Sequence, residues 1–495
     1  MNYQDRGSLV GGSWIEGEGE ELISRNPARK GDIVWRGRAV SPGQVESAVA
    51  AARRAFPEWS ASGLESRIEI LSRVEEVVEK RDEDLAKAIT EEMGKPIRES
   101  RGEARSILGK LKASIEAQRR LPDTALPGAP GRSVWRPHGV MAVIGPSNYP
   151  IHLLNTHIAP ALLAGNTVVV KPSPITSASG QIYAEIMQEV GLADGVFNLV
   201  VGGHEVGQAM VAHHDVHAVA FTGGWGAGRQ IMQSCLEQPR KLLALEMGGK
   251  NIAVVLEDAH IPQTVHELVL GACLTTGQRC TATSRLIVHR KIADELIDRL
   301  SRAFQRIKPG DPFADDTLMG PLATLEAREN FLSRIQDYEA SGLKALVRSE
   351  AMEGGAFVTP SIHLVEDDGE QAQDYLNTEF FAPNLAVQIV DDAESAKAIC
   401  AQSAFGLSMS VFSENQAVFE EFSREVPCGI FNWNRSTNNA SGLLPFGGLG
   451  YSGNHRAAGS TSALYCSRPT AVLERDFGNF SPDPVYGPVL AELIE

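Results

Sequence analysis

Three stretches near the start of the chain carry apolar residues at helical spacing, with charged residues between them. They cover residues 45–56, 66–94 and 96–120. Apolar positions that recur every three to four residues predict amphipathic helices. Three prolines then interrupt the pattern at 121–131, which favours either a linker or the tip of an excursion from the main fold. We therefore expect a helical region that ends before this segment.

Beyond residue 134, short apolar runs alternate with helical stretches. Nearly continuous apolar strands between helices are typical of a parallel, doubly wound sheet, because its strands are buried on both faces. The alternation continues after the run 242–256, so we expect a second α/β domain that begins near residue 249. Residues 459–474 predict a strand outside this rhythm, of the kind that docks on a partner chain. The other expected strands are 140–145, 167–173, 197–203, 217–224, 284–289, 385–390 and 408–413, and the expected helices are 151–165, 177–191, 262–276, 291–307 and 391–402.

The length of 495 residues corresponds to about three domains. A hydrophobic share of 43% and a charged share of 22% exclude disorder as the dominant state, because they supply enough apolar material for a core. Apolar runs such as 140–144 are far shorter than the ~20 residues that a membrane-spanning helix needs. The first residues lack a basic start followed by an apolar core, so we expect no signal peptide and a cytoplasmic protein.

Charge and cysteine content exclude two further classes. The chain has 62 acidic and 46 basic residues, a net charge of −16, which argues against nucleic-acid binding. Its six cysteines show no CxxC spacing, so they form neither a zinc motif nor a disulfide scaffold. We expect reduced thiols and no metal site. The histidines, which we interpret as solvated or capping, include His213, His214, His217 and His455.

Cys280 is the first candidate for chemistry. A cysteine is nucleophilic as the thiolate, which needs a helix N-terminus, a positive charge or a base nearby. Arg279 is adjacent and Gly277 precedes it. A lone cysteine is more often inert, so these residues alone leave both interpretations open.

Eight motifs, one of which contains Cys280, together resemble the aldehyde dehydrogenase superfamily in order and spacing. The resemblance extends from about residue 26 to about residue 474. The motifs lie at 145–150, 160–173, 221–228, 245–251, 277–280, 379–383, 432–434 and 445–453. The resemblance implies an α/β, aldehyde dehydrogenase-like fold that forms a homodimer or homotetramer. The implied parts are a Rossmann-type NAD(P)-binding domain at 1–117 and 138–248, an α/β catalytic domain at 249–446, and an oligomerisation β-flap at 118–137 and 459–476.

The resemblance assigns three catalytic roles. Cys280 attacks the aldehyde to give a thiohemiacetal, and the Asn148 amide with the Cys280 backbone N–H binds the oxyanion. Glu246 is the general base that hydrolyses the resulting thioester, and its apolar surroundings suit a carboxyl whose pKa is raised by burial. Its presence favours a free acid over transfer to coenzyme A. Taken alone, Glu246 could equally cap a turn, and Asn148 is more simply a turn residue.

The resemblance also implies a nicotinamide cofactor. The glycines at 223–228 would place backbone N–H groups and a helix N-terminus at the pyrophosphate. Lys171 resembles the lysine that binds the adenosine ribose, and Glu379 the glutamate that binds the nicotinamide ribose. Outside the motifs, both would be interpreted as solvated charges. The expected cofactor residues are Lys171, Ser173, Gly223, Gly224, Gly228, Glu379 and Phe381.

Four positions depart from the family pattern. Gly224 replaces a serine that contacts phosphate, and Ala382 replaces a glycine. Ser147 stands where an aromatic residue is frequent, which widens the substrate entrance. Pro174 replaces the glutamate that selects NAD. Without that carboxylate a 2′-phosphate is not repelled, so NAD is expected and NADP stays open.

The substrate is the least determined feature. Within the superfamily, the chain is most similar to enzymes that oxidise N-succinylglutamate semialdehyde in bacterial arginine degradation. A carboxylated substrate needs cationic or N–H donors, and the candidates are Thr281, Arg435, Ala440 and Ser441. Arg435 could equally form a surface salt bridge. The alternatives are another aliphatic or aromatic aldehyde and a non-catalytic binding relative.

Overall fold

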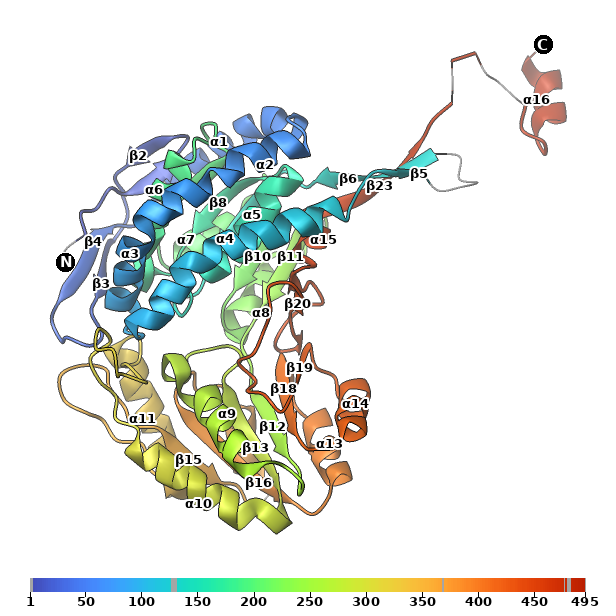
Figure 1. Ribbon diagram of the computed structural model, residues 1–495. Coiled ribbons are helices and arrows are strands. Elements are labelled where there is room, and N and C mark those ends of the chain that lie inside the picture. The colour runs from blue at the N-terminus through green and yellow to red at the C-terminus, as the bar shows by residue number, and fades with distance from the viewer. Residues whose placement is uncertain (1–2, 126–130, 367–368, 476, 479–481, 495) are drawn as a thin grey trace.

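The computed structural model describes residues 3–125, 131–366, 369–475, 477–478 and 482–494 (Figure 1). The helical region predicted from the periodicity is confirmed, but the stretch predicted at 66–94 forms two helices instead of one. The four helices are α1 (Pro42–Ala61), α2 (Leu64–Ser72), α3 (Val74–Met93) and α4 (Ile97–Arg119). Gly94 ends α3 in the left-handed conformation, which glycine adopts without strain. No helix in the described part of the chain is long and apolar enough to cross a membrane.

The first large sheet has seven strands in the order β11-β10-β7-β8-β9-β1-β2. The strands β7 to β11 are parallel, and β1 and β2 add an antiparallel edge. Because parallel strands end at the same edge, Ile144, Lys171, Thr222 and Glu246 meet there: Ile144 pairs with Lys171, and Thr222 with Glu246. The strands are β1 (Ser8–Val10), β2 (Ser13–Ile15), β7 (Val140–Ile144), β8 (Thr167–Lys171), β9 (Phe197–Leu199), β10 (Val216–Thr222) and β11 (Leu242–Glu246).

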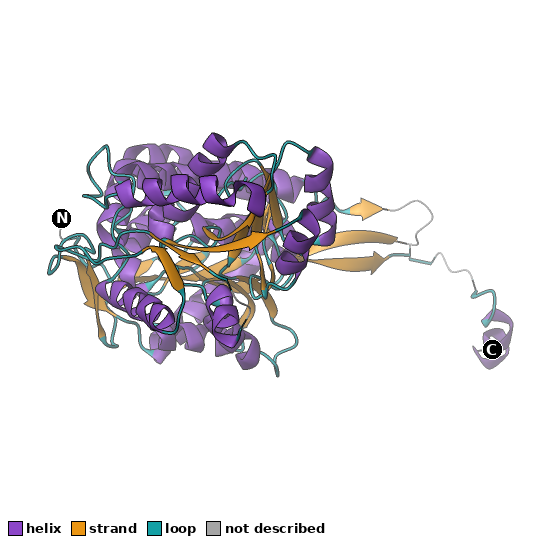
Figure 2. Cartoon of the chain, turned by 90° about the horizontal axis from the view of Figure 1, so that it is seen from below, coloured by secondary structure: helices purple, strands orange, loops and turns teal. Residues whose placement is uncertain are grey.

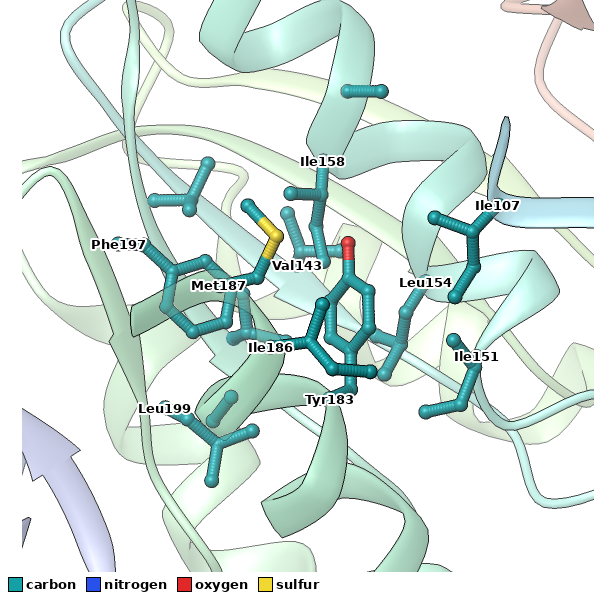
Figure 3. Close-up of a cluster of buried hydrophobic side chains, with 14 of the residues drawn as sticks. Ile107, Val143, Ile151, Leu154, Ile158, Tyr183, Ile186, Met187, Phe197 and Leu199 are labelled. Atoms are coloured by element: carbon teal, nitrogen blue, oxygen red, sulfur yellow. The ribbon is translucent and has the colours of Figure 1, made fainter. Parts of the chain in front are cut away.

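Helices cover both faces of this sheet, which explains the continuous apolar strands. One apolar cluster joins α3, α4, α5 (His152–Ala164) and α6 (Ser177–Glu189) to one face. Tyr183 lies within it among Val143, Leu154 and Ile158 (Figure 3), and its hydroxyl donates to Asn155 at 2.9 Å. A second cluster joins α1, α7 (His204–Ala212) and α8 (Trp225–Ser234) to the other face.

The second large sheet has the order β14-β15-β16-β13-β12-β18-β19 and is parallel except for β14. Helices α9 (Ile261–Cys273) and α10 (Arg290–Arg306) pack on one face, and α13 (Ala393–Ala401) and α14 (Gln416–Glu425) on the other. Two further helices are α11 (Leu325–Ala340) and α12 (Glu370–Asn377). The strands are β12 (Asn251–Val255), β13 (Thr283–His289), β14 (Lys344–Val347), β15 (Ser361–Leu364), β16 (Asn384–Val390), β18 (Ser408–Phe412) and β19 (Ile430–Trp433).

A three-stranded antiparallel ribbon, β5 (Thr124–Ala125), β6 (Gly131–Pro137) and β23 (Ser467–Leu473), extends away from the body (Figure 2). The expected strand at 459–474 is therefore shorter than predicted, because residues 462–466 form the short helix α15 (Ser462–Cys466). Parts of the predicted flap, residues 126–130 and 476, lie outside the described residues. The C-terminal helix α16 (Gly487–Ile494) lies beyond the ribbon in Figure 1.

The predicted helices and strands between 140 and 413 are confirmed within a few residues of their ends. The doubly wound α/β architecture is also confirmed, since two large, mainly parallel sheets form along the chain. The sequence analysis missed several elements, among them the hairpin β3 (Glu21–Arg25) and β4 (Ile33–Arg38), which have little apolar alternation. The domain boundaries stay a prediction.

Candidate active site

A cavity of about 390 Å³ contains many of the predicted site residues. It lies at the carboxyl ends of β7, β10 and β11 of the first sheet. The loop that precedes β13 of the second sheet also lines it. We call it the Cys280 cavity. Its walls include Asn148, Ser173, Gly223, Gly224, Cys280, Glu379 and Phe381, together with Pro146, Ser147, Leu153, Thr222, Met247 and Gly248.

The loop before Cys280 has an unusual backbone. Thr275, Thr276 and Gly277 have φ values of 52°, 56° and 68°, a left-handed conformation that is costly for a β-branched residue. Side-chain contacts stabilise it: Thr275 donates to Glu99 at 2.6 Å, and Thr276 to the Gly320 carbonyl at 2.9 Å. This strained turn fixes where the thiol points.

Arg279, expected as a charge beside the thiol, faces elsewhere. Its guanidinium donates to Glu99 at 2.8 Å and lies over the Tyr149 ring. Burial therefore dominates at Cys280: with the carboxylates of Glu379 and Glu246 it raises the pKa of the thiol to about 12, against a weaker lowering by Arg279. The resting group is the thiol.

Asn148 is held from both sides. Its amide nitrogen donates to the Gln278 carbonyl at 2.9 Å, which leaves one N–H for another acceptor. The backbone carbonyl of Asn148 accepts from Lys95 Nζ at 3.0 Å. Lys95 also donates to Glu103, a carboxylate that accepts from the backbone N–H groups of residues 151 and 152. This buried pair, Lys95 in the turn between α3 and α4 and Glu103 on α4, fixes the loop that carries Asn148 and was not predicted from the sequence.

Glu246 ends β11 and is buried. Its Oε2 has no hydrogen-bond partner among the described residues. Burial raises the pKa of this carboxyl well above its usual value, although the Ala458 N–H and the charge of Lys110 act in the opposite direction. Glu246 does not line the Cys280 cavity, but the next two residues, Met247 and Gly248, do, and its charge acts on the Cys280 thiol. A Cβ on Gly447 would come within 2.9 Å of its Oε1.

A neighbouring cavity of about 290 Å³, the Lys171 cavity, shares Pro146, Ser173, Gly223 and Gly224 with the first. Lys171 Nζ donates to the carbonyls of residues 172 and 202, and burial lowers the pKa of this lysine to about 8. The helix α8 starts at this cavity from Gly224, and no described side chain caps it. Its free N–H groups and the open space beside Gly224 suit a phosphate group.

Gly228 differs from the other predicted cofactor residues. It lines neither cavity, and a Cβ there would lie 2.3 Å from the Met247 sulfur. Gly228 therefore permits close packing of α8 against the residue that follows β11, and its predicted contact with the cofactor stays a prediction.

Glu379 and Phe381 close the far side of the Cys280 cavity. Glu379 accepts from the Gly249 N–H at 2.8 Å, and burial raises the pKa of its carboxyl to about 7. A side chain at Gly248 would overlap this carboxylate, at 1.9 Å from Oε2. Phe381 has a φ of 52°, an unusual conformation for an aromatic residue.

The structure does not bring the predicted substrate residues to the Cys280 cavity. Arg435, Ala440 and Ser441 line a separate cavity of about 480 Å³ beside β19, which shares no lining residue with the first. Arg435 is exposed and donates to Asn439 at 3.0 Å. Thr281 is adjacent to Cys280, but its hydroxyl donates to Asn438 at 3.0 Å.

The histidines predicted to be solvated or capping include a pair that lies close to an aspartate. Ligand atoms of His213, His214 and Asp215 lie within 4.8 Å of one another, which the spacing did not indicate. His213 is paired with Glu46 and Asp215 with Arg53, so these groups already have protein partners.

Comparisons with known proteins agree with the geometry. The aldehyde dehydrogenase family model matches residues 14–472. The chain is 40% identical to an N-succinylglutamate 5-semialdehyde dehydrogenase of Novosphingobium aromaticivorans, over 92% of this chain and 96% of the relative. It is 38% identical to the protein of the same name from Enterobacter sp., over 94% of each. The crystal structure of PnpE in complex with nicotinamide adenine dinucleotide is 31% identical, with a TM-score of 0.89 over 96% of this chain and 99% of that one.

A match over almost the whole chain, with the motif residues grouped around two connected cavities, decides the family. The chain belongs to the aldehyde dehydrogenase family and is an NAD(P)-dependent oxidoreductase that acts on a small-molecule aldehyde.

Proposed function

We propose that this protein oxidises N-succinylglutamate semialdehyde to N-succinylglutamate with NAD(P), through a covalent intermediate on Cys280. The observation that carries the proposal is the Cys280 cavity, where the thiol shares its walls with Asn148, Glu379 and the glycines after β10. The relatives that share 36–40% identity with the chain and carry this substrate in their name support the choice of aldehyde.

The residues of the chain divide the chemistry. The Cys280 sulfur forms a bond to the aldehyde carbon, and the thiol proton leaves to solvent or base. The free N–H of Asn148 and the Cys280 backbone N–H stabilise the oxyanion; one such donor is worth about 2.7–4 kcal/mol of barrier. NAD(P), when bound, accepts the hydride from the aldehyde carbon. Lys171, Ser173, Gly223, Gly224 and Glu379 would hold it.

Glu246 completes the cycle. The thioester on Cys280 is attacked by a water whose proton Glu246 accepts, the carbon–sulfur bond breaks, and the free acid leaves. A buried carboxyl with a raised pKa is suited to this exchange near neutral pH. Two observations favour Glu246 as this base: its charge acts on Cys280, and its Oε2 has no hydrogen-bond partner among the described residues.

Two features of the surroundings extend the proposal. The ribbon β5-β6-β23 leaves the body and exposes Leu473, which supports a homo-oligomer that pairs this ribbon with another copy. Six free cysteines support a reducing, cytoplasmic location. Light scattering of the wild type, with a truncation of the ribbon beside it, tests the first point; a monomer that stays active would contradict it.

The substrate is tested by a panel. We would measure kcat/KM for N-succinylglutamate semialdehyde, succinate semialdehyde and propanal, each with NAD and NADP, from the absorbance of the reduced cofactor. The proposal predicts a preference of two or more decades for the succinylated aldehyde. A flat profile contradicts the substrate and leaves only the family chemistry.

A further inference from the structure

Lys110 on α4 is a charged side chain without a described partner. It is half-buried, and no described residue forms a hydrogen bond or an ion pair with its ammonium group. The neighbouring Lys112, in contrast, is exposed and lies 3.6 Å from Glu75. A half-buried ammonium group without a protein partner is partly desolvated and can gain from contact with an anion.

Two parts of the chain, the loop at Gly442 and the carboxyl of Glu246, interact with or approach this ammonium group. Nζ lies 3.5 Å from the point where a Cβ on Gly442 would stand, so Lys110 approaches the loop that also carries Ala440 and Ser441. Its charge also acts on Glu246, the group beside the Cys280 cavity. Lys110 is therefore close to the loop at 440–442, and its charge acts on the proposed base Glu246.

The other titratable groups near Lys110 do not neutralise it. His152 and His157 both experience its field, and burial together with that field lowers the pKa of each to about 3. Both are neutral at physiological pH. Burial raises the pKa of the Glu246 carboxyl well above its usual value, and this group forms no hydrogen bond or ion pair with Lys110 among the described contacts. Burial lowers the pKa of Lys110 to about 8, which still leaves it charged at neutral pH. Its ammonium group therefore has no direct ion-pair partner among the described residues.

Arg435 is a weaker candidate for the same task. It is exposed and already donates to Asn439. An exposed cation in water contributes little to binding, whereas a partly desolvated one gains more from a carboxylate.

We propose that Lys110 is the cation that binds a carboxylate of the semialdehyde and so determines specificity for acidic substrates. The inference rests on the proposed function and names the group that selects its substrate. A Lys⁺–carboxylate contact is charge-assisted, and losing it typically costs roughly 10- to 100-fold in binding.

The test is a specificity ratio: kcat/KM for N-succinylglutamate semialdehyde divided by that for propanal. We expect Lys110→Met to lower this ratio roughly 10- to 100-fold, mainly through KM for the acidic aldehyde. Lys110→Arg should keep most of it, and Lys112→Met, on the same helix, should keep it entirely. Calorimetric titration with N-succinylglutamate should show the same loss of affinity in Lys110→Met.

Different results would overturn the proposed substrate and the proposed role of Lys110. A wild type that prefers the acidic aldehyde and keeps its ratio in Lys110→Met overturns this inference alone. An equal loss for both aldehydes, with unchanged N-succinylglutamate affinity, also overturns it, because Lys110 would then act through Glu246. A wild type that prefers neither aldehyde and does not bind N-succinylglutamate overturns both the proposed substrate and this inference.

Discussion

Glu99 accepts a hydrogen bond from Arg279 at 2.8 Å, although 180 residues separate them in the sequence. The same carboxylate accepts from the Thr275 hydroxyl at 2.6 Å. The pair therefore ties helix α4 to the strained loop before Cys280 and directs the neighbouring guanidinium away from the thiol.

The ion pair between Glu99 and Arg279 should affect the reactivity of the Cys280 thiol. Since the pKa of Cys280 is raised to about 12, the thiolate fraction is small at pH 7 and increases about tenfold per pH unit until the pKa is reached. Alkylation of the cofactor-free enzyme by iodoacetamide should rise in the same way between about pH 7 and pH 9. Glu99→Gln should accelerate alkylation at pH 7, because it releases Arg279, and should lower kcat. A plateau in the wild-type rate near pH 8 would contradict the account.

Asn148 should contribute to kcat rather than to substrate binding. Asn148→Ala removes the proposed oxyanion donor, so kcat should fall about 10²–10³-fold with a small change in KM. Steady-state kinetics provide the measurement, and thermal unfolding provides the control for folding. A change in KM with an unaltered kcat would show that Asn148 only shapes the cavity.

The cofactor choice should depend on position 174. Pro174 lines the Lys171 cavity, and no acidic residue is among the described residues that line it. A carboxylate there would repel a 2′-phosphate. Pro174→Glu should therefore raise the ratio of kcat/KM for NAD over NADP by about tenfold. An unchanged ratio would place the ribose elsewhere.

The buried pair Lys95–Glu103 should matter for stability. Both side chains are fully buried, and removing one partner of such a pair costs about 3–5 kcal/mol. Lys95→Met should lower the free energy of unfolding by this amount in urea titrations. The double variant Lys95→Met, Glu103→Gln should recover part of the loss, because Gln still accepts from the backbone. Equal destabilisation by both variants would argue against an uncompensated Glu103 charge as the cause.

The sequence predicted those parts of the fold that have local periodicity. The helices α1–α4 and the strands that end at Ile144 and Lys171 follow directly from the spacing of apolar residues. The motifs that resemble the aldehyde dehydrogenase superfamily led to Cys280 and Glu379, although neither residue lies within a predicted helix or strand. The position of Gly228 against Met247 could not be predicted, since it depends on how closely α8 packs.

The charged residues of α4 that contact the site could not be identified from the sequence. Glu99, Glu103 and Lys110 are three of many charges on α4, and the helical pattern does not distinguish a solvated charge from one that contacts a loop far along the chain. Arg279 shows the opposite limit: adjacency to Cys280 suggested activation, but the left-handed turn at 275–277 directs its side chain to Glu99.

The central claim is that Cys280 carries a thioester that Glu246 hydrolyses. The most direct measurement is rapid mixing of Glu246→Gln with aldehyde and cofactor, followed by mass analysis of the intact protein and of its peptides. Cys280→Ala is the control. The account predicts a burst of one reduced cofactor per site, slow turnover afterwards, and an acyl group on the peptide that contains Cys280. Unimpaired steady-state turnover in Glu246→Gln, or a burst in Cys280→Ala, would contradict it.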